Sequence, residues 1–443
     1  MAHPRRKRSL PSEPVRVAIE SLTHDGRGIA RVDGKPVFVD GALPGEEVSF
    51  VYTDSRRDYA EGRLESLHVA APGRVPPRCP SFGICGGCSF QHVADGEQIR
   101  HKQALLVEQF QRIARLASVP LLPPLTGPSW GYRHKARLGV KHVAKKGKVL
   151  VGFRERASAF ITDLDTCPVL HPAIGEHLPE LAAMIGELGI RDRVPQIEVA
   201  VGDGRAALVF RILEDLSEAD RACLVAFGER SGFDIYTQRQ GPDSVAPLHP
   251  AAPAPLTYAL PEQGVTFRFQ PTDFTQVNLE INRRMVSRVM ELLAPEPHER
   301  VLDLFCGIGN FTLPLATRAG HVVGVEGGAE AVARARENAA ANGIGNVEFH
   351  VADLTQPFAG QPWAAGRYDR ILLDPSRAGA EAVLAGVPEW DARRIVYVSC
   401  NPATLARDAG LLVHRYGYRL VHAGVMDMFP QTAHVESIAV FER

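Results

Sequence analysis

In the last third of the sequence, five residues able to do chemistry each come at the end of a short apolar run. Four are carboxylates and the fifth is a cysteine: Asp303, Glu326, Asp353, Asp374 and Cys400. The apolar runs alternate with helical patterns, which predicts a parallel, doubly wound sheet. Because ligands of such sheets collect where the carboxyl ends of the strands meet, we expect these five residues around one ligand site.

The loop after the first of these strands, "DLFCGIGNFT", contains Gly307 and Gly309, which allow a ligand to approach the backbone closely. A dinucleotide fingerprint requires a third glycine, and Thr312 stands in its place. Several carboxylates would also repel a pyrophosphate. S-adenosylmethionine, which has a positive centre and a ribose diol, suits the acidic residues better. The structural alternative is that each acid only caps the helix that follows it.

Cys400 lies at the junction "IVYVSCNPATL", between a predicted buried strand and a predicted helix. Asn401 is a suitable N-cap and Pro402 a suitable first helical residue. The positive end of a helix lowers the pKa of a neighbouring thiol, so we expect Cys400 to be a nucleophile. Cys223 and Cys306 are interpreted as small buried hydrophobic residues.

A thiolate beside a methyl donor has a definite use. Addition of the thiolate to carbon 6 of uracil makes an enolate whose carbon 5 can attack the methyl group. A base must then remove the proton from carbon 5 before the thiol can leave. Glu436 in "QTAHVES" is the candidate base, with His434 as the second choice. The structural alternative for Glu436 is a solvated strand residue.

Three regions are expected to position these groups. Residues 14–70 contain short β-rich runs separated by turn residues and predict a five-stranded barrel. Residues 75–270 mix strands and helices as a central α+β domain, in which a helix over 96–117 is expected to pack on the methyltransferase domain. Residues 271–443 hold the doubly wound sheet.

The net charge of −1 conceals an asymmetry along the chain. Residues 1–160 contain 26 Lys and Arg against 15 Asp and Glu. Within "YRHKARLGVKHVAKKGKVLVGFRER", one strand parity carries Arg133, Lys135, Arg137 and Lys141. A solvated face is the plain reading of such a run, but a basic face in a basic half favours RNA phosphates. The target uridine would have to be unstacked to expose carbon 6.

Three cysteines stand close together and a fourth precedes a proline, as the first does. These are Cys79, Cys85, Cys88 and Cys167. Four thiolates can hold zinc or an iron-sulfur cluster, and their spacing does not decide between them. We expect a metal site with a structural or RNA-positioning role and no redox turnover.

The segments "DLFCGIGNF", "LLDPSRAG", "VSCNPATLARD" and "HVES" together resemble the RNA uracil-5-methyltransferase family. With the leading barrel and the cysteines, the sequence is most similar to the bacterial branch that methylates 23S ribosomal RNA. The resemblance implies an N-terminal OB-like (TRAM) β-barrel, an α+β central domain with an iron-sulfur site, and a C-terminal Rossmann-like class I methyltransferase domain.

The resemblance also implies roles for single residues. Cys400 would be the nucleophile, Glu436 the proton-abstracting base, and the four clustered cysteines the ligands of a 4Fe-4S cluster. Asp374 would also lie near the target base. The contacts to S-adenosylmethionine would be made by Gln276, Phe305, Asn310, Glu326, Asp353 and Asp374.

Other classes of protein are less consistent with the sequence. No apolar run is long enough for a membrane helix, and the basic N-terminus lacks the apolar segment of a signal peptide, so we expect a cytoplasmic protein. The sequence does not indicate the oligomeric state, and a monomer is the default expectation. A transfer RNA uridine methyltransferase is the nearest alternative, although those enzymes usually lack the barrel and the cysteines. An N6-adenine methyltransferase needs a "[DN]PP[YFW]" motif, which "DPSR" and "NPAT" do not supply. A non-catalytic RNA-binding redox sensor would not need Cys400 and Glu436 together.

Overall fold

The computed structural model describes residues 10–443. Contacts divide the chain into two compact units. The first runs up to Arg100 and includes Pro430–His434, and the second comprises His101–Phe429 and Val435–Arg443. Over the described residues, no helix has the length and apolar character needed to cross a membrane.

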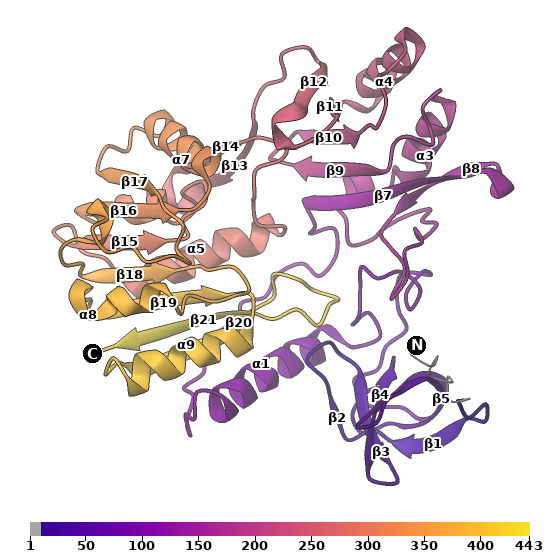
Figure 1. Ribbon diagram of the computed structural model, residues 1–443, viewed down its shortest axis with the longest axis horizontal. Helices are drawn as coiled ribbons and strands as arrows, with labels where there is room; N and C mark the ends of the chain where they lie inside the picture. Colours follow the sequence, from indigo (N-terminus) through magenta and orange to yellow (C-terminus); the bar gives the residue numbers. More distant parts are fainter. Residues whose placement is uncertain (1–9) are drawn as a thin grey trace, which may run out of the picture. The chain divides into compact units, whose positions relative to one another are not determined.

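The first unit contains a six-stranded sheet in the order β1-β5-β6-β4-β3-β2 (Figure 1). Its apolar core includes Val37, Val48 and Phe50, all fully buried. The predicted barrel has five strands, and the sixth is the two-residue β2, which pairs with β3 and is too short to recognise by alternation. The bounds are β1 Val15–Ala18, β2 Ser21–Leu22, β3 Gly28–Val32, β4 Lys35–Asp40, β5 Glu47–Ser55 and β6 Ala60–Val69.

The second unit begins within helix α1, Asp95–Arg112. The helix ends earlier than the predicted 96–117, because Arg115 has a left-handed φ of 56° that an α-helix cannot include. The second half of α1 is bonded to the chain beyond β20: Lys102 Nζ donates to Asp427 Oδ1 at 2.7 Å and to the Phe429 carbonyl at 2.9 Å.

A central sheet in the second unit has the order β12-β11-β10-β9-β7-β8, and its apolar core includes residues of α3 and α4. Four of its five strand pairs are antiparallel, and β10 with β11 is the parallel pair. A separate hairpin, β13–β14, follows. The bounds are β7 Lys135–Val143, β8 Lys148–Gly152, α2 Pro172–Gly175, α3 Leu178–Glu187, β9 Gln196–Val201, β10 Ala206–Arg211, α4 Glu218–Ser231, β11 Asp234–Gln238, β12 Val245–His249, β13 Leu256–Leu260 and β14 Val265–Phe269.

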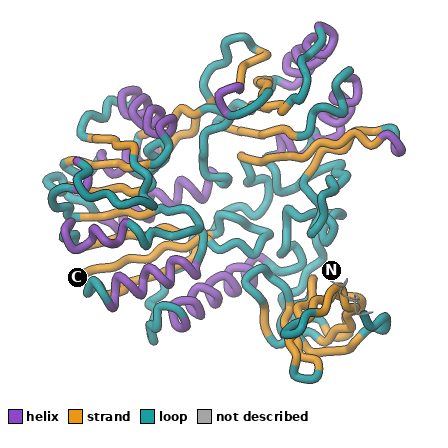
Figure 2. The backbone as a smooth tube through the Cα atoms, viewed as in Figure 1, coloured by secondary structure: helices purple, strands orange, loops and turns teal. Residues whose placement is uncertain are grey.

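A seven-stranded sheet with helices on both faces completes the second unit (Figure 2). Its order is β17-β16-β15-β18-β19-β21-β20, and only β21 runs antiparallel to its neighbours. The predicted doubly wound sheet is therefore present. The bounds are α5 Leu279–Leu293, β15 Arg300–Leu304, α6 Thr312–Ala316, β16 His321–Glu326, α7 Ala329–Ala341, β17 Val347–Val351, β18 Arg370–Leu373, α8 Val387–Trp390, β19 Arg394–Ser399, α9 Pro402–His414, β20 Arg419–Met426 and β21 Glu436–Glu442.

Candidate active site

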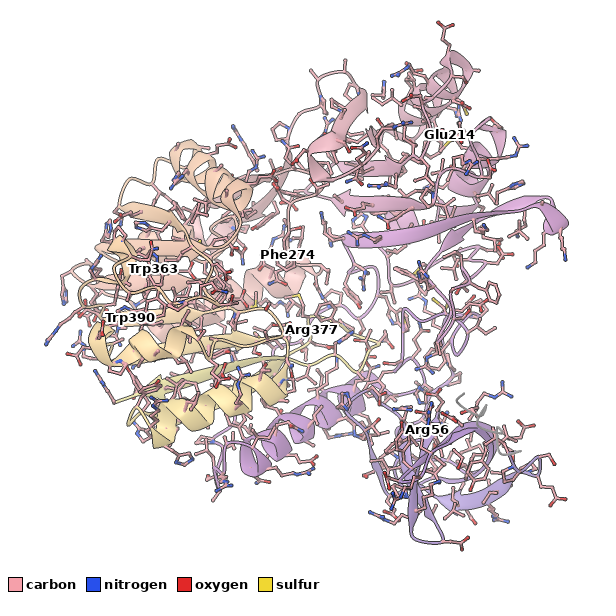
Figure 3. The ribbon with its side chains drawn as sticks, in the orientation of Figure 1. Arg56, Glu214, Phe274, Trp363, Arg377 and Trp390 are labelled. Atoms are coloured by element: carbon pink, nitrogen blue, oxygen red, sulfur yellow. The ribbon has the colours of Figure 1, made fainter. Side chains whose placement is uncertain are left out.

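The carboxyl ends of the parallel strands meet at one edge of the seven-stranded sheet. Glu326 is the last residue of β16, Asp374 directly follows β18 and Cys400 directly follows β19. Asp303 lies one residue inside β15, paired in register with Leu372 of β18. In Figure 3, Arg377 and Phe274 are labelled at this edge, and the buried Trp363 and Trp390 at the opposite edge.

The direction of β21 brings Glu436 to the same edge. Because β21 is antiparallel to β19, its first residue lies where β19 ends, and Ser399 pairs in register with Ser437. Ser437 Oγ donates to the Ser399 carbonyl at 3.1 Å, which fixes that register. Cys400 follows Ser399 and Glu436 precedes Ser437, so the ladder brings both residues to this edge, where the charge of Glu436 raises the pKa of Cys400. The alternative base, His434, falls in the segment grouped with the first unit.

We call the set Asp303, Glu326, Asp374, Cys400 and Glu436 the strand-edge site. The start of α9 next to it is capped as predicted: Asn401 Oδ1 accepts from the Ala403 N–H at 3.1 Å, and Pro402 is the first helical residue. Even so, burial raises the pKa of the Cys400 thiol to about 11, and the charges of Glu436 and Asp374 act in the same direction. The expected lowering of this pKa by the helix end is therefore wrong in this structure.

Two carboxyl groups of the site, Asp303 and Glu436, are buried, and those of Glu326 and Asp374 are half-buried. Asp303 is fully buried, and its Oδ2 accepts from Thr312 Oγ1 at 2.5 Å, while Oδ1 has no partner among the described residues. Burial raises the pKa of Asp303 to about 8 and that of Asp374 to about 7. Burial, and then the charge of Asp374, raise the pKa of Glu436 well above its usual range. Such a site favours protons or a cationic ligand.

The loop after β15 lies beside these acids. Phe305 has a left-handed φ of 68°, a conformation that is strained for a residue with a side chain, and its N–H donates to the Val325 carbonyl at 2.8 Å. The Glu326 carboxylate accepts from the N–H groups of Gly307 at 3.2 Å and Gly328 at 3.0 Å. These bonds hold the Glu326 side chain at the glycine loop.

The side chain of Asn310 is bonded to other residues of the protein. It exchanges two hydrogen bonds with Asn282 of α5, at 2.9 and 3.0 Å, and accepts from the Tyr258 hydroxyl at 2.8 Å. Sequence reasoning missed both partners, because they lie 28 and 52 residues away. Asn310 thus ties the glycine loop to α5 and to β13.

The two remaining predicted contacts have different surroundings. Asp353 lies after β17 and is exposed, and its Oδ1 accepts from the backbone N–H of Thr355 at 2.9 Å and from its hydroxyl at 2.6 Å, which lowers the pKa of Asp353. Gln276 lies on the loop before α5. That loop is held by Lys135 Nζ, which donates to the Pro271 carbonyl at 2.5 Å, and by the N–H of His134, which donates to Val277 at 2.8 Å.

The predicted basic face of β7 is only partly available as a charged surface. Lys135 is bonded to the loop before α5, and burial lowers its pKa to about 8. Arg137 pairs with Glu198 at 2.6 Å, and the Arg133 guanidinium lies 5.6 Å from the centre of the Phe153 ring. Lys141 remains exposed. Strand parity indicates the face of a residue, whereas its neighbours decide its exposure.

A buried carboxylate behind the site links its parts. Asp408 of α9 is fully buried, and its Oδ2 accepts from the Tyr397 hydroxyl at 2.6 Å and from the Ala380 N–H at 2.7 Å. Tyr397 lies on β19 three residues before Cys400, and Ala380 ends the loop that follows Asp374. The carboxylate therefore joins both segments to α9.

Arg377 is the residue that sequence reasoning did not assign. Its carbonyl accepts from Asn401 Nδ2 at 3.1 Å and from Thr404 Oγ1 at 3.3 Å, so its backbone is fixed to the start of α9. The charge of its exposed guanidinium favours the ionised forms of Cys400 and Glu436. It therefore partly offsets the rise that burial causes in the pKa of each. "LLDPSRAG" contains this residue, but no spacing rule indicates its effect.

The predicted metal site is wrong. Among residues 10–443, no group of three or more His, Cys, Asp or Glu side chains is placed to hold a metal ion. This contradicts the iron-sulfur part of the predicted fold class, whereas the individual roles of Cys79, Cys85, Cys88 and Cys167 stay predictions.

The cysteines have other surroundings in the fold. Cys79 and Cys85 are buried in a turn-rich loop, in which the Cys79 N–H donates to Gln91 Oε1 at 2.9 Å and the Gly87 N–H donates to Cys85 Sγ at 3.4 Å. Cys167 packs against the apolar core of the central sheet.

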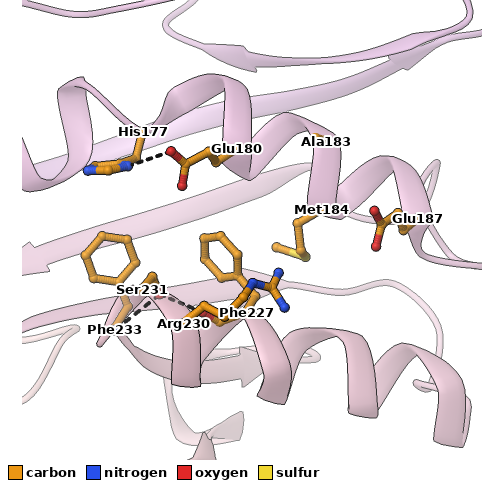
Figure 4. Close-up of a pocket in the computed structure, with 9 residues that line it drawn as sticks. All are labelled: His177, Glu180, Ala183, Met184, Glu187, Phe227, Arg230, Ser231 and Phe233. Atoms are coloured by element: carbon orange, nitrogen blue, oxygen red, sulfur yellow. Dashed lines mark hydrogen bonds and ion pairs between the residues drawn. The ribbon is translucent and has the colours of Figure 1, made fainter.

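A cavity of about 370 Å³ lies elsewhere, between α3 and α4 of the central region (Figure 4). Buried apolar side chains, Met184, Phe227 and Phe233, form part of its wall, and a His177–Glu180 pair at 3.0 Å lies on α3 beside it. None of the predicted site residues lines this cavity. It is therefore separate from the strand-edge site.

Comparison with known proteins adds independent information. Residues 257–443 match the family described as tRNA (Uracil-5-)-methyltransferase, and residues 8–64 match the TRAM domain. The chain is 62% identical to the 23S rRNA (uracil(1939)-C(5))-methyltransferase RlmD of Methylococcus capsulatus over 100% of both chains. It is 57% identical to the protein of that name from Alkalilimnicola ehrlichii over 99% of both.

A solved structure shares this architecture. The tRNA (uracil-54, C5)-methyltransferase of Pyrococcus abyssi, in complex with S-adenosyl-L-homocysteine, superposes with a TM-score of 0.74 at 25% identity. The match covers 96% of this chain and 100% of that one.

Proposed function

Because the chain belongs to the RNA uracil-5-methyltransferase family, we propose that it methylates carbon 5 of a uridine in 23S ribosomal RNA, with S-adenosylmethionine as the methyl donor. The names of its relatives specify uridine 1939, and we propose the equivalent uridine here. The observation that carries the proposal is the placement of Cys400 opposite Glu436 at an edge crowded with carboxylates.

The residues of the strand-edge site fit S-adenosylmethionine. A buried carboxylate oxygen without a partner, on Asp303, and raised pKa values at Asp374 and Glu436 favour a ligand with a positive charge. S-adenosylmethionine, when bound, supplies an electrophilic methyl group. We propose that Gln276, Phe305, Asn310, Glu326, Asp353 and Asp374 surround it, with Asn310 acting by holding the glycine loop.

The protein residues then divide the chemistry between them. The Cys400 thiol gives its proton to solvent, and the thiolate Sγ adds to carbon 6 of uracil, so that the electron pair of the ring double bond makes carbon 5 nucleophilic. After carbon 5 has been methylated, the Glu436 carboxylate takes the carbon 5 proton, and the bond between carbon 6 and Sγ breaks. Burial makes Glu436 a stronger base once it is ionised, which suits proton removal from carbon.

The exposed residues at this edge suit an RNA substrate. Phe274, on the loop that carries Gln276, is 76% exposed, and the guanidinium of Arg377 is exposed (Figure 3). A planar ring and a cation are the groups that contact an unstacked base and its phosphate. We propose that the protein works as a cytoplasmic monomer with three regions, 14–70, 75–270 and 271–443, since one chain supplies both Cys400 and Glu436.

The test uses RNA oligonucleotides with 5-fluorouridine at the target position. Fluorine cannot be abstracted as a proton, so a covalent complex should accumulate on the wild-type protein in the presence of S-adenosylmethionine. Cys400→Ala should form no complex, yet it should bind S-adenosylmethionine with unchanged affinity. RNA binding without any adduct would contradict carbon 5 chemistry.

A second candidate substrate is transfer RNA, which the matched family and the Pyrococcus abyssi enzyme both name. The adduct assay should therefore be run with a 23S oligonucleotide that spans uridine 1939 and, separately, with a transfer RNA stem-loop that contains uridine 54. Faster adduct formation on the transfer RNA would overturn the ribosomal assignment while leaving the chemistry intact.

A further inference from the structure

One aromatic ring of the central region stands in water on a well-fixed loop. Phe160 is 73% exposed, on the loop between β8 and Thr162. The loop is closed by backbone hydrogen bonds, from Glu155 N–H to Phe160 at 3.0 Å and from Thr162 N–H to Phe153 at 2.9 Å. The Phe160 N–H also donates to Ser158 Oγ at 3.0 Å. The backbone that presents the ring is therefore fixed on both sides.

The next residue anchors the loop on the sheet. A Cβ atom on Gly139 of β7 would lie only 2.2 Å from Cδ1 of Ile161, so Ile161 occupies the space that glycine leaves. Gly139 has the same strand parity as Arg137 and Lys141. Ile161 therefore lies between these two basic positions on one face of β7, and Phe160 extends from beside that face.

Cations without ion pairs gather on the same hairpin. Lys141, Lys145 and Lys146 are exposed, and among the described residues none of the three forms an ion pair. Two neighbouring cations do form ion pairs: Arg137 pairs with Glu198 at 2.6 Å, and Lys148 pairs with Asp163 at 2.7 Å. Lys141 lies two residues from Gly139, beside the Phe160 loop, whereas Lys145 and Lys146 lie in the turn at the far end of the hairpin. An exposed aromatic ring with unpaired cations along the same hairpin matches the chemistry of an extended single strand of nucleic acid, which combines phosphates with stackable bases.

We propose that Phe160, Lys141, Lys145 and Lys146, together the Phe160 platform, bind the RNA that flanks the target uridine. An unpaired base stacks on the Phe160 ring, and the three lysines contact phosphates. The inference rests on the proposed function and extends it by naming a second RNA contact outside the strand-edge site. It explains why this chain holds a large apolar ring in water on a fixed loop.

The experiment measures binding of the 23S oligonucleotide to full-length variants. Phe160→Ala should weaken RNA binding about 5- to 100-fold, the range for loss of one base–aromatic stack. Phe160→Trp should retain affinity, and its fluorescence should be quenched by RNA beyond the change seen in the wild-type protein. Leu213→Ala is the matched control, because Leu213 is also an exposed apolar residue of the central sheet region, at 50%. It should leave affinity unchanged.

The outcomes separate this inference from the proposed function. If Phe160→Ala and Leu213→Ala both bind RNA as the wild type does, and Phe160→Trp shows no added quenching, the platform is wrong while methylation stands. If the wild-type protein binds no 23S oligonucleotide and forms no adduct, the proposed function itself fails. Equal thermal unfolding temperatures of the variants and the wild type would exclude loss of folding as the cause, since the Phe160 side chain is mostly in water.

Discussion

At the strand-edge site carboxyl groups are withdrawn from water, whereas on the Phe160 platform cations stand in it. Burial raises the pKa of Asp303 to about 8 and that of Asp374 to about 7, so protonation there depends on what is bound. Lys141, Lys145 and Lys146 are exposed, where cations attract phosphates within about a Debye length. The comparison indicates that the first region is built for chemistry and the second for capture.

The largest expected effect comes from a substitution that changes only the strand-edge site. Glu436→Gln keeps the shape but removes the base, so methylation should fall by about 10²- to 10⁴-fold. Cys400 can still add to the ring, and a covalent complex with ordinary, unfluorinated RNA should accumulate on a denaturing gel. Glu389→Gln, an exposed glutamate on α8, is the control and should turn over normally. Normal turnover of Glu436→Gln would remove Glu436 from the mechanism.

The next effect concerns the carboxylate behind the site. Asp408→Asn replaces a carboxylate that accepts from Tyr397, Ala380 and Arg407 by an amide that also donates, so the segments of Tyr397 and Ala380 should separate. We expect kcat to fall about 10- to 100-fold, as for a displaced catalytic group, with the Kd for S-adenosylmethionine unchanged. Tyr397→Phe removes one of these hydrogen bonds and should lower kcat less than Asp408→Asn does.

Two measurements distinguish positioning from a general loss of stability in Asp408→Asn. Thermal unfolding reports the stability, and single-turnover rates at a temperature well below unfolding report the chemistry. If the rate at low temperature equals that of the wild type, Asp408 serves only the stability of the fold.

A smaller effect is expected on the reactivity of Cys400, which reports the negative charge around its thiol. With a thiol pKa of about 11, alkylation of Cys400 by iodoacetamide should rise about tenfold per pH unit between pH 7 and pH 10, because only the thiolate reacts. Glu436→Gln removes a neighbouring negative charge, lowers this pKa, and should speed alkylation at pH 8 by about threefold to tenfold. Peptide mass spectrometry follows Cys400, with Cys223 as an internal control. A flat pH profile would contradict the raised pKa.

The smallest effect concerns the capture region. Lys145→Ala and Lys146→Ala together should reduce the dependence of RNA binding on salt, by a slope of about 0.7 for each phosphate contact that is lost. The rate of adduct formation at saturating RNA should not change, because both lysines lie in the turn between β7 and β8 and neither belongs to the strand-edge site. An altered rate at saturating RNA would show that these lysines affect the chemical step as well as RNA binding.

The parts of the site that could be predicted from the sequence are those that depend on neighbours along the chain. The ends of the strands and the Asn401 cap follow from periodicity and turn chemistry. The raised pKa of Cys400 could not be predicted from the sequence. It depends on burial and on the charges of Glu436 and Asp374, which come close to Cys400 only through the sheet. The burial of Lys135 depends in the same way on a loop more than a hundred residues away.

The cysteines show how a pattern along the chain can predict too much, because they gave the iron-sulfur part of the predicted fold class. Their spacing resembled that of a metal site, but spacing says nothing of where the side chains turn. The backbone bonds of Cys79 and the apolar packing of Cys167 were not readable from the sequence. Periodicity therefore predicted the ends of the strands, which the sheet itself fixes, whereas spacing gave no information on the surroundings of cysteines in an irregular loop.

The single antiparallel strand has a consequence for how this enzyme tolerates change. Cys400 and Glu436 are separated along the chain by a helix, a strand and two connections, yet the hydrogen-bond ladder between β19 and β21 sets their spacing. Insertions in the surface turn before β20 should therefore be harmless to the pair. Deletion of one residue between β20 and β21 that shifts the ladder by one position would turn Glu436 to the other face of the sheet.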